Sequence, residues 1–211
     1  MFRDRADAAG RLARALKHFR GRPDLLVLAV PRGGLPVGAL LARELGAGLD
    51  VVLTKKIGHP HNPEFAIGAV SLTGAEVDLD VLRREGVDPN YAVREAERLR
   101  EVLRERYRLY RGDAKPPEVR GRTVILTDDG VATGRTLAAA VSWLREEGAA
   151  RVVVAVPVGP PDAVARLREI ADEVVCLETP DDFMAIGQYY RDFDQVPDEE
   201  AVALLRGAAR R

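Results

Sequence analysis

The chain has 211 residues, 46% of them apolar, and a formal net charge of −1. This length and apolar content suit one domain with a real core, and the near-zero charge gives no electrostatic support for binding nucleic acid or a membrane surface. No apolar run approaches the roughly 20 residues that span a bilayer, and no apolar segment follows the charged residues 1–5, so neither an anchor nor a signal peptide is expected. The expected location is the cytoplasm.

The first quarter of the chain alternates between helical and strand-like patterns. Apolar side chains at helical spacing predict an amphipathic first helix over residues 2–19, and Gly46 is expected to end a second helix. Continuous apolar runs predict buried strands. The expected elements are helices over residues 2–19 and 35–45 and strands over residues 25–30 and 50–54.

Polar and turn-forming residues dominate the next part. Residues 55–64 contain Gly58, Pro60 and Pro63 and are expected to form a loop. Thr73-Gly74 lies between two strand-like segments, which predicts a hairpin.

A long charged helix is expected to begin at Asp88-Pro89, because proline suits the first helical position. Its apolar stripe consists of Ala92, Ala96, Leu99, Leu103 and Tyr107. The charged remainder is interpreted as a solvated face, with a subunit contact as the alternative.

The second half repeats a strand–helix order. Strands are expected over residues 123–127, 151–158 and 173–177, and helices over 134–147, 162–170 and 198–205. Near-continuous apolar strands alternating with helices predict an α/β fold, with a mainly parallel sheet flanked by helices. We expect one domain, residues 1–211, with a hairpin/helix insertion at about 73–115 and a small C-terminal hood at about 180–211. The single cysteine, Cys176, is interpreted as a structural thiol in a buried strand.

Residues 124–136 carry the clearest chemical signal. A buried strand ends in two adjacent carboxylates, and a short loop with two glycines and two threonines leads into a helix. Loop amides and a helix N-terminus suit a phosphate, while the acids suit the hydroxyl groups of a ribose. An ordinary capped turn is the alternative, but it needs neither the acid pair nor both threonines. The residues concerned are Asp128, Asp129, Gly130, Val131, Ala132, Thr133, Gly134, Arg135 and Thr136.

This stretch resembles the motif with which type I phosphoribosyltransferases bind 5-phosphoribosyl-1-pyrophosphate (PRPP): two acidic residues, then G-x-x-T-G-x-T after an apolar strand. The resemblance implies that these nine residues bind PRPP and that Asp128 and Asp129 are catalytic. It also implies Mg²⁺ as cofactor, held by the two acids directly or through PRPP and water. A Walker A loop and a dinucleotide fingerprint are both missing.

The same resemblance assigns roles to two earlier segments. The stretch Pro31-Arg32-Gly33-Gly34 corresponds to the loop that grips pyrophosphate, where Arg32 supplies charge and Gly33 and Gly34 allow close approach. Lys55 and Lys56 are half of the chain's lysines, and their compact positive charges suit the leaving pyrophosphate. Lys56 is a catalytic candidate. A plain turn and a solvated strand end are the respective alternatives.

His59, His61 and Glu64 lie where the family has its flexible catalytic loop. The two histidines are poorly supported as metal ligands, because no cysteine or third histidine nearby completes a site. Contact with phosphate or general acid–base help stays open for them, as does activation of the nucleophile by Glu64.

The C-terminal stretch, residues 180–193, is rich in aromatic residues and corresponds to the family's hood over the acceptor. Phe183 would stack on a planar acceptor and Arg191 would reach pyrophosphate. The alternative is an aromatic cluster that packs the last helix. Enzymes of this family that act on 6-oxopurines place a lysine after the strand at 152–158, where this chain has Gly159-Pro160-Pro161; this departure puts hypoxanthine and guanine specificity in doubt.

The resemblance therefore implies transfer of the phosphoribosyl group from PRPP to a nitrogenous acceptor, a nucleobase being favoured. A PRPP-sensing regulatory protein is the main alternative, and a subunit of the PRPP synthetase type is a third. The expected partners are PRPP and a small-molecule acceptor, without nucleic acid or membrane, and the expected assembly is a homodimer. Purine, pyrimidine, pyridine carboxylate and amine acceptors stay open.

Overall fold

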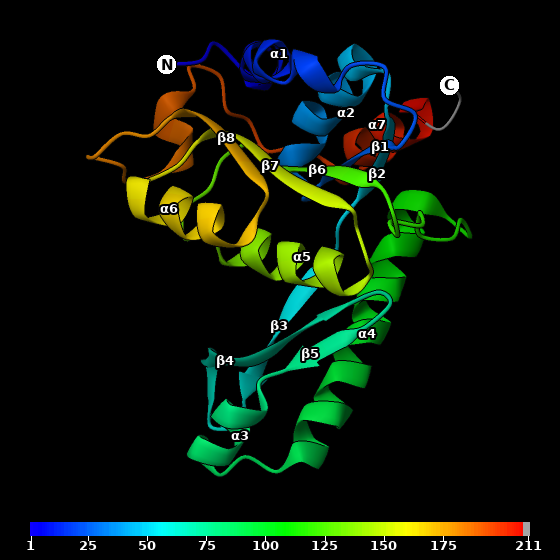
Figure 1. The fold of residues 1–211 in the computed structure, drawn as a ribbon, viewed down its shortest axis with the longest axis vertical. Coiled ribbons are helices and arrows are strands. Elements are labelled where there is room, and N and C mark those ends of the chain that lie inside the picture. Colours follow the sequence, from blue (N-terminus) through cyan, green and yellow to red (C-terminus); the bar gives the residue numbers. More distant parts are fainter. Residues whose placement is uncertain (209–211) are drawn as a thin grey trace. The chain divides into compact units, whose positions relative to one another are not determined.

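The computed structural model describes residues 1–208, apart from the side chain of Glu64, and they form two compact units (Figure 1). The first unit comprises Met1–Val52 and the chain from Lys115 onward, and the second comprises Leu53–Ala114. The second unit thus begins at Leu53, whereas an insertion was expected from about residue 73. Residues 209–211, the end of the expected hood, lie outside the described residues.

A five-stranded parallel sheet forms the centre of the first unit, in the order β2-β1-β6-β7-β8. Every side chain of β1 and β6 is buried, as continuous apolar strands of a two-sided parallel sheet require. The strand bounds are β1 Leu25–Ala29, β2 Gly48–Val51, β6 Thr123–Thr127, β7 Arg151–Val158 and β8 Glu173–Glu178.

Helices cover both faces of this sheet (Figure 1). One face carries α1 (Arg5–Ala15), α2 (Gly34–Leu45) and α7 (Asp198–Ala208), and the other carries α5 (Arg135–Glu146) and α6 (Pro161–Ile170). Short 3₁₀ turns occur at Lys17–Phe19 and Ile186–Tyr189. The apolar stripes of α5 and α6 meet the sheet in one continuous core. The expected α/β fold with a helix-flanked parallel sheet is therefore confirmed.

The order of the strands creates a switch point between β1 and β6. From β1 the chain continues to β2 at one edge, whereas from β6 it continues through β7 to β8 at the other edge. β1 and β6 are direct neighbours, with Ala29 paired to Thr127 at their carboxyl ends. Because ligands of open α/β sheets bind outside the carboxyl ends at such a point, the loops after β1 and β6 are the first place to look for a site.

The second unit contains an antiparallel three-stranded sheet and two helices. β3 (Thr54–His59), β4 (Asn62–Ser71) and β5 (Ala75–Val77) pair in chain order, and α3 (Leu79–Glu85) and α4 (Pro89–Arg111) follow. The expected hairpin is confirmed, since the amide of Ser71 donates to the Gly74 carbonyl oxygen at 2.8 Å. α4 buries every member of its expected apolar stripe, which faces β3 and β4.

Three expectations about local structure were wrong. Residues 55–64 form most of a β3–β4 hairpin and not a loop, because the glycine at Gly58 lets the Pro63 main chain approach closely; a Cβ there would lie 2.6 Å from the Pro63 oxygen. The strand expected over residues 50–54 is divided between two strands: its first residues end β2, and its last residue begins β3. The apolar run continues across this boundary, so the sequence pattern does not show it. The first helix begins only at Arg5, and Phe2 instead forms a bridge with Tyr190.

Along residues 1–208, no helix combines the length and the apolar character that crossing a bilayer requires. Cys176 lies in β8, whose side chains are all half-buried and not fully buried as expected. Partial burial still raises the pKa of its thiol to about 11.

Candidate functional site

Two loops meet at the switch point: the β1 loop (residues 31–34) and the β6 loop (residues 128–134). Their contact depends on glycine. A Cβ on Gly34 would lie 2.9 Å from the Asp128 Cα, and one on Gly33 would overlap the Asp129 carboxylate. The peptide bond between Pro31 and Arg32 is cis. The sequence motif and the expected pyrophosphate loop are thus brought into direct contact, as their positions after neighbouring strands require.

The β6 loop presents open hydrogen-bond donors. The Val131 amide donates to the Val158 carbonyl oxygen at 2.8 Å. Within residues 1–208, however, the next amides along the loop, those of Ala132, Thr133 and Gly134, have no hydrogen-bond partner. Gly134 has φ of 75°, a left-handed conformation that suits glycine, and α5 begins at the next residue. Consecutive free amides at a helix N-terminus form a binding place for an anion.

The two acids occupy different environments. Asp128 is half-buried, and its Oδ1 accepts a hydrogen bond from the Asp129 amide at 2.8 Å. Burial, and secondly the charge of Asp129, raise the pKa of Asp128 well above its ordinary value. Asp129 is 7% exposed; burial raises its pKa as well, but the neighbouring guanidinium of Arg5 opposes the rise. Asp129 is therefore the acid that the protein itself helps to keep ionised.

Two residues that the sequence reasoning missed contact Asp129. Arg5 forms an ion pair with its carboxylate, Nη2 lying 2.8 Å from Oδ2. The Tyr190 hydroxyl donates to the Asp129 carbonyl oxygen at 2.6 Å. Tyr190 belongs to the aromatic stretch noted in the sequence, but nothing near Arg5 in the sequence marked it as part of a site.

A groove of about 680 Å³ lies between α5 and α6 and is lined in part by Ala132, Thr133 and Gly134 of the β6 loop. Arg166 lies in it, pairs with Asp162 and donates to the Thr133 carbonyl oxygen at 3.3 Å. Neither Asp128 nor Asp129 lines this groove. We therefore place the candidate site at the switch point, where the two acids and the open amides occur together.

The remaining charged candidates are distributed over both units. Arg32 lies in the β1 loop, with its Nη1 3.7 Å from Oδ1 of Asp198, at the start of α7. Lys55 and Lys56 lie in β3 of the second unit, paired with Val70 and Ala69. Their contribution to the leaving group stays a prediction.

His59 ends β3 and His61 lies in the turn that follows, where the His61 amide donates to Nδ1 of His59 at 3.2 Å. The side chain of Glu64 lies outside the described part of the chain. The roles considered for these three residues stay predictions.

The aromatic residues of the C-terminal stretch form a cluster. Phe183 stacks on Tyr189 with ring centroids 5.6 Å apart, and the cluster packs against Phe2 and Val158. It thus covers the chain's N-terminal segment, whereas α7 packs against α2 and β2. Arg191 is exposed, and its amide donates to the Phe2 carbonyl oxygen at 2.9 Å. Stacking of Phe183 on an acceptor stays a prediction.

Comparison with known proteins gives a consistent result. The family model described as "Phosphoribosyl transferase domain" matches residues 3–194. Two curated proteins of Mycobacterium tuberculosis, "Putative phosphoribosyl transferase MT0597" and "Putative phosphoribosyl transferase Rv0571c", are each 45% identical over 213 residues. The match covers 100% of this chain and 47% of each relative, so the chain spans about half the length of these relatives. The crystal structure of TT1426 from Thermus thermophilus is 50% identical, with a TM-score of 0.85 and 97% of each chain covered.

Proposed function

The chain belongs to the phosphoribosyl transferase domain family, and from this premise we propose that it transfers the 5-phosphoribosyl group of PRPP to a nitrogenous acceptor, with a nucleobase favoured. In this reaction the acceptor nitrogen forms a bond to C1 of the ribose. The bond from C1 to the pyrophosphate oxygen breaks, and pyrophosphate leaves with the electron pair. The acceptor nitrogen then loses its proton.

One observation carries the proposal. The open amides of Ala132, Thr133 and Gly134 lie a few residues after the two adjacent acids Asp128 and Asp129, at the switch point of the sheet. Amides alone would suit any anion, and the acids alone would repel one. A sugar phosphate satisfies both, because its phosphate accepts from the amides while its hydroxyl groups donate to the carboxylates.

The side chains near the site fit a magnesium ion that arrives with its substrate. Within residues 1–208, no group of three histidine, cysteine or acidic side chains could hold a metal ion. Asp128 and Asp129 are hard oxygen donors, and magnesium is commonly bound by one or two carboxylates together with substrate phosphates and water. When bound, the ion would neutralise charge on the pyrophosphate as it leaves.

The chain's own contribution is then mainly positional and electrostatic. The β6 loop would fix the 5-phosphate, and the acids would orient the sugar so that C1 faces the acceptor. The Arg32 side chain and the amides of Arg32 and Gly33 in the β1 loop would stabilise the charge that develops on pyrophosphate, without reorganisation during the reaction.

Calorimetric titration of PRPP into the protein at millimolar magnesium tests the binding step. We expect heat of binding for the wild type, and a loss of affinity of about tenfold or more for Asp128→Asn, because the amide can donate where the diol requires an acceptor. Glu118→Gln, an exposed substitution ahead of the amino end of β6, serves as the control and should bind like the wild type. Absence of heat with the wild-type protein would contradict the proposal.

Release of pyrophosphate, measured against a panel of purines, pyrimidines, pyridine carboxylates and amines, tests the transfer step. A base that accelerates release identifies the acceptor class. Binding of PRPP without release for any acceptor would instead favour a PRPP-sensing protein.

A further inference from the structure

Arg5 makes three contacts with residues far away in the sequence. Its Nε and Nη2 lie 2.9 and 2.8 Å from Oδ2 of Asp129, and its Nη1 donates to the Asp194 carbonyl oxygen at 2.7 Å. The guanidinium thus joins the second acid of the β6 loop to the chain just after the aromatic cluster. Its planar array of donors suits such a fixed, multiple contact.

The pair is buried, unlike most ion pairs of this protein. The Arg5 side chain is 12% exposed and the Asp129 side chain 10%, and the Phe193 ring lies 4.0 Å from the Arg5 guanidinium carbon. Exposed ion pairs are screened by water and fluctuate, whereas a buried, stacked guanidinium has one defined position. The direction of the Asp129 carboxylate is therefore set by Arg5.

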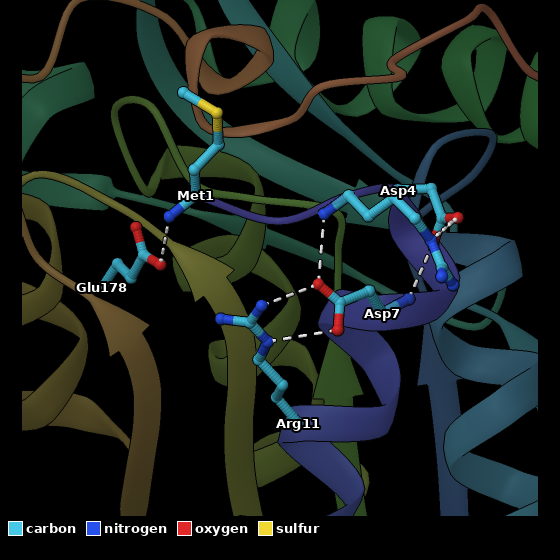
Figure 2. A network of polar contacts seen from close by, with 6 residues as sticks. Met1, Asp4, Asp7, Arg11 and Glu178 are labelled. Atoms are coloured by element: carbon cyan, nitrogen blue, oxygen red, sulfur yellow. Dashed lines mark hydrogen bonds and ion pairs between the residues drawn. The ribbon is translucent and has the colours of Figure 1, made fainter.

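The position of Arg5 in its helix also needs an explanation. Arg5 is the first residue of α1, where the helix dipole disfavours a positive charge. Neighbouring acids offset this cost: Asp4 caps the helix, accepting from the Asp7 amide at 2.7 Å, and Asp7 pairs with Arg11. Figure 2 shows this network together with the ion pair between the Met1 amino group and Glu178.

The main chain of Asp129 is held in place as well. Phe2 forms a bridge with Tyr190, and the Tyr190 hydroxyl donates to the Asp129 carbonyl oxygen. Asp129 is thus fixed through its main chain by Tyr190 and through its side chain by Arg5. Both contacts come from segments outside the β6 loop.

We propose that Arg5 is a positioning residue of the PRPP site, which directs the Asp129 carboxylate so that it accepts from the ribose diol. This inference rests on the proposed function and adds the N-terminal helix to the site. It predicts that loss of Arg5 weakens recognition of the sugar hydroxyl groups, although Arg5 itself touches neither phosphate nor sugar.

Calorimetry with three probes tests this role: PRPP, ribose 5-phosphate and 2-deoxyribose 5-phosphate, each at millimolar magnesium. For Arg5→Met we expect PRPP affinity to fall about tenfold, and the preference for ribose over deoxyribose to shrink by about threefold or more. Arg5→Lys retains the charge but not the planar array of donors, and should recover only part of both. Arg14→Met, an exposed substitution on the same helix, should match the wild type.

A purely structural role for Arg5 would weaken both sugar phosphates equally, and an unchanged ribose preference in Arg5→Met would therefore overturn the inference. PRPP affinity within about twofold of the wild type would overturn it too. If Arg5→Met does not fold, Phe193→Leu removes the ring beside the guanidinium and should shift both quantities in the same direction; wild-type values would again overturn the inference. Absence of PRPP binding by the wild type would instead overturn the proposed function on which it rests.

Discussion

Adjacent acids of one motif differ in what surrounds them. Asp129 has a buried cation beside it, whereas Asp128 is half-buried next to the like charge of Asp129. Desolvation without a partner destabilises the ionised form of a carboxyl group. The ionised Asp128 should therefore lower the stability of the folded protein at neutral pH. Its proposed role in binding PRPP would explain such a loss of stability.

Unfolding measurements on Asp128→Asn can detect this cost. Because its pKa is raised in the folded state, the Asp128 carboxyl loses favourable free energy as pH rises from its unfolded pKa near 4 toward the folded value. The asparagine variant should therefore be more stable than the wild type at pH 7.5. Urea unfolding at several pH values should show this gain shrinking toward pH 4.

Asp129→Asn provides the contrast, because it leaves Arg5 buried without its carboxylate and should lose stability at pH 7.5. An Asp128→Asn variant whose stability difference is negative, or independent of pH, would contradict the assignment of the cost to burial of Asp128.

At the scale of elements, the site is a junction of two loops rather than one loop. The β1 loop lies against the β6 loop because Gly33 and Gly34 have no side chains to separate them. Two further hydrogen bonds hold the β6 loop: the Val131 amide donates to Val158 in β7, and Arg166 on α6 donates to the Thr133 carbonyl oxygen. Changes in either loop should therefore affect the other.

Gly33→Ala tests this junction. The added methyl group would overlap the Asp129 carboxylate, so we expect a loss of about 1–3 kcal/mol in the free energy of unfolding and weaker PRPP binding. Gly10→Ala is the matched control: it lies within α1, its Cβ would come no closer than 3.9 Å to Arg14, and it should gain about 0.5–1 kcal/mol. Equal effects of the two substitutions, measured by chemical unfolding, would show that the loops do not pack as described.

Over the whole molecule, the two sheets differ in how fully they are covered. The strand β6 is buried on both faces and pairs with a neighbour on each side, whereas β5 pairs on one side only and exposes Ala75 and Glu76. Buried, doubly paired strands open only with the global transition, and exposed edges open locally.

Hydrogen-exchange mass spectrometry should therefore find amides of β6 exchanging at least about tenfold more slowly than those of β5, as expected when the opening free energies differ by more than about 1.4 kcal/mol. The adjacent strand β1 should behave like β6. Similar protection of β5 and β6 would contradict this distribution of stability.

Patterns along the chain predict the parallel α/β fold and the position of the β6 loop. Both depend on local patterns: apolar strands alternating with helices, and two acids followed by glycine and threonine where a strand becomes a helix. Arg32, Gly33 and Gly34 were assigned through the resemblance to type I phosphoribosyltransferases, because these residues by themselves fit a plain turn equally well.

The difference between the two acids arises from long-range contacts in the folded chain. Arg5 and Tyr190 reach Asp129 across separations of 124 and 61 residues, and no periodicity or spacing encodes such contacts. The same limit explains residues 55–64 of the β3–β4 hairpin, a polar stretch whose strands are defined by pairing with each other and not by an apolar pattern. Local sequence patterns therefore identified the β6 loop. Long-range packing places the Arg5 guanidinium beside Asp129 and sets the direction of that carboxylate.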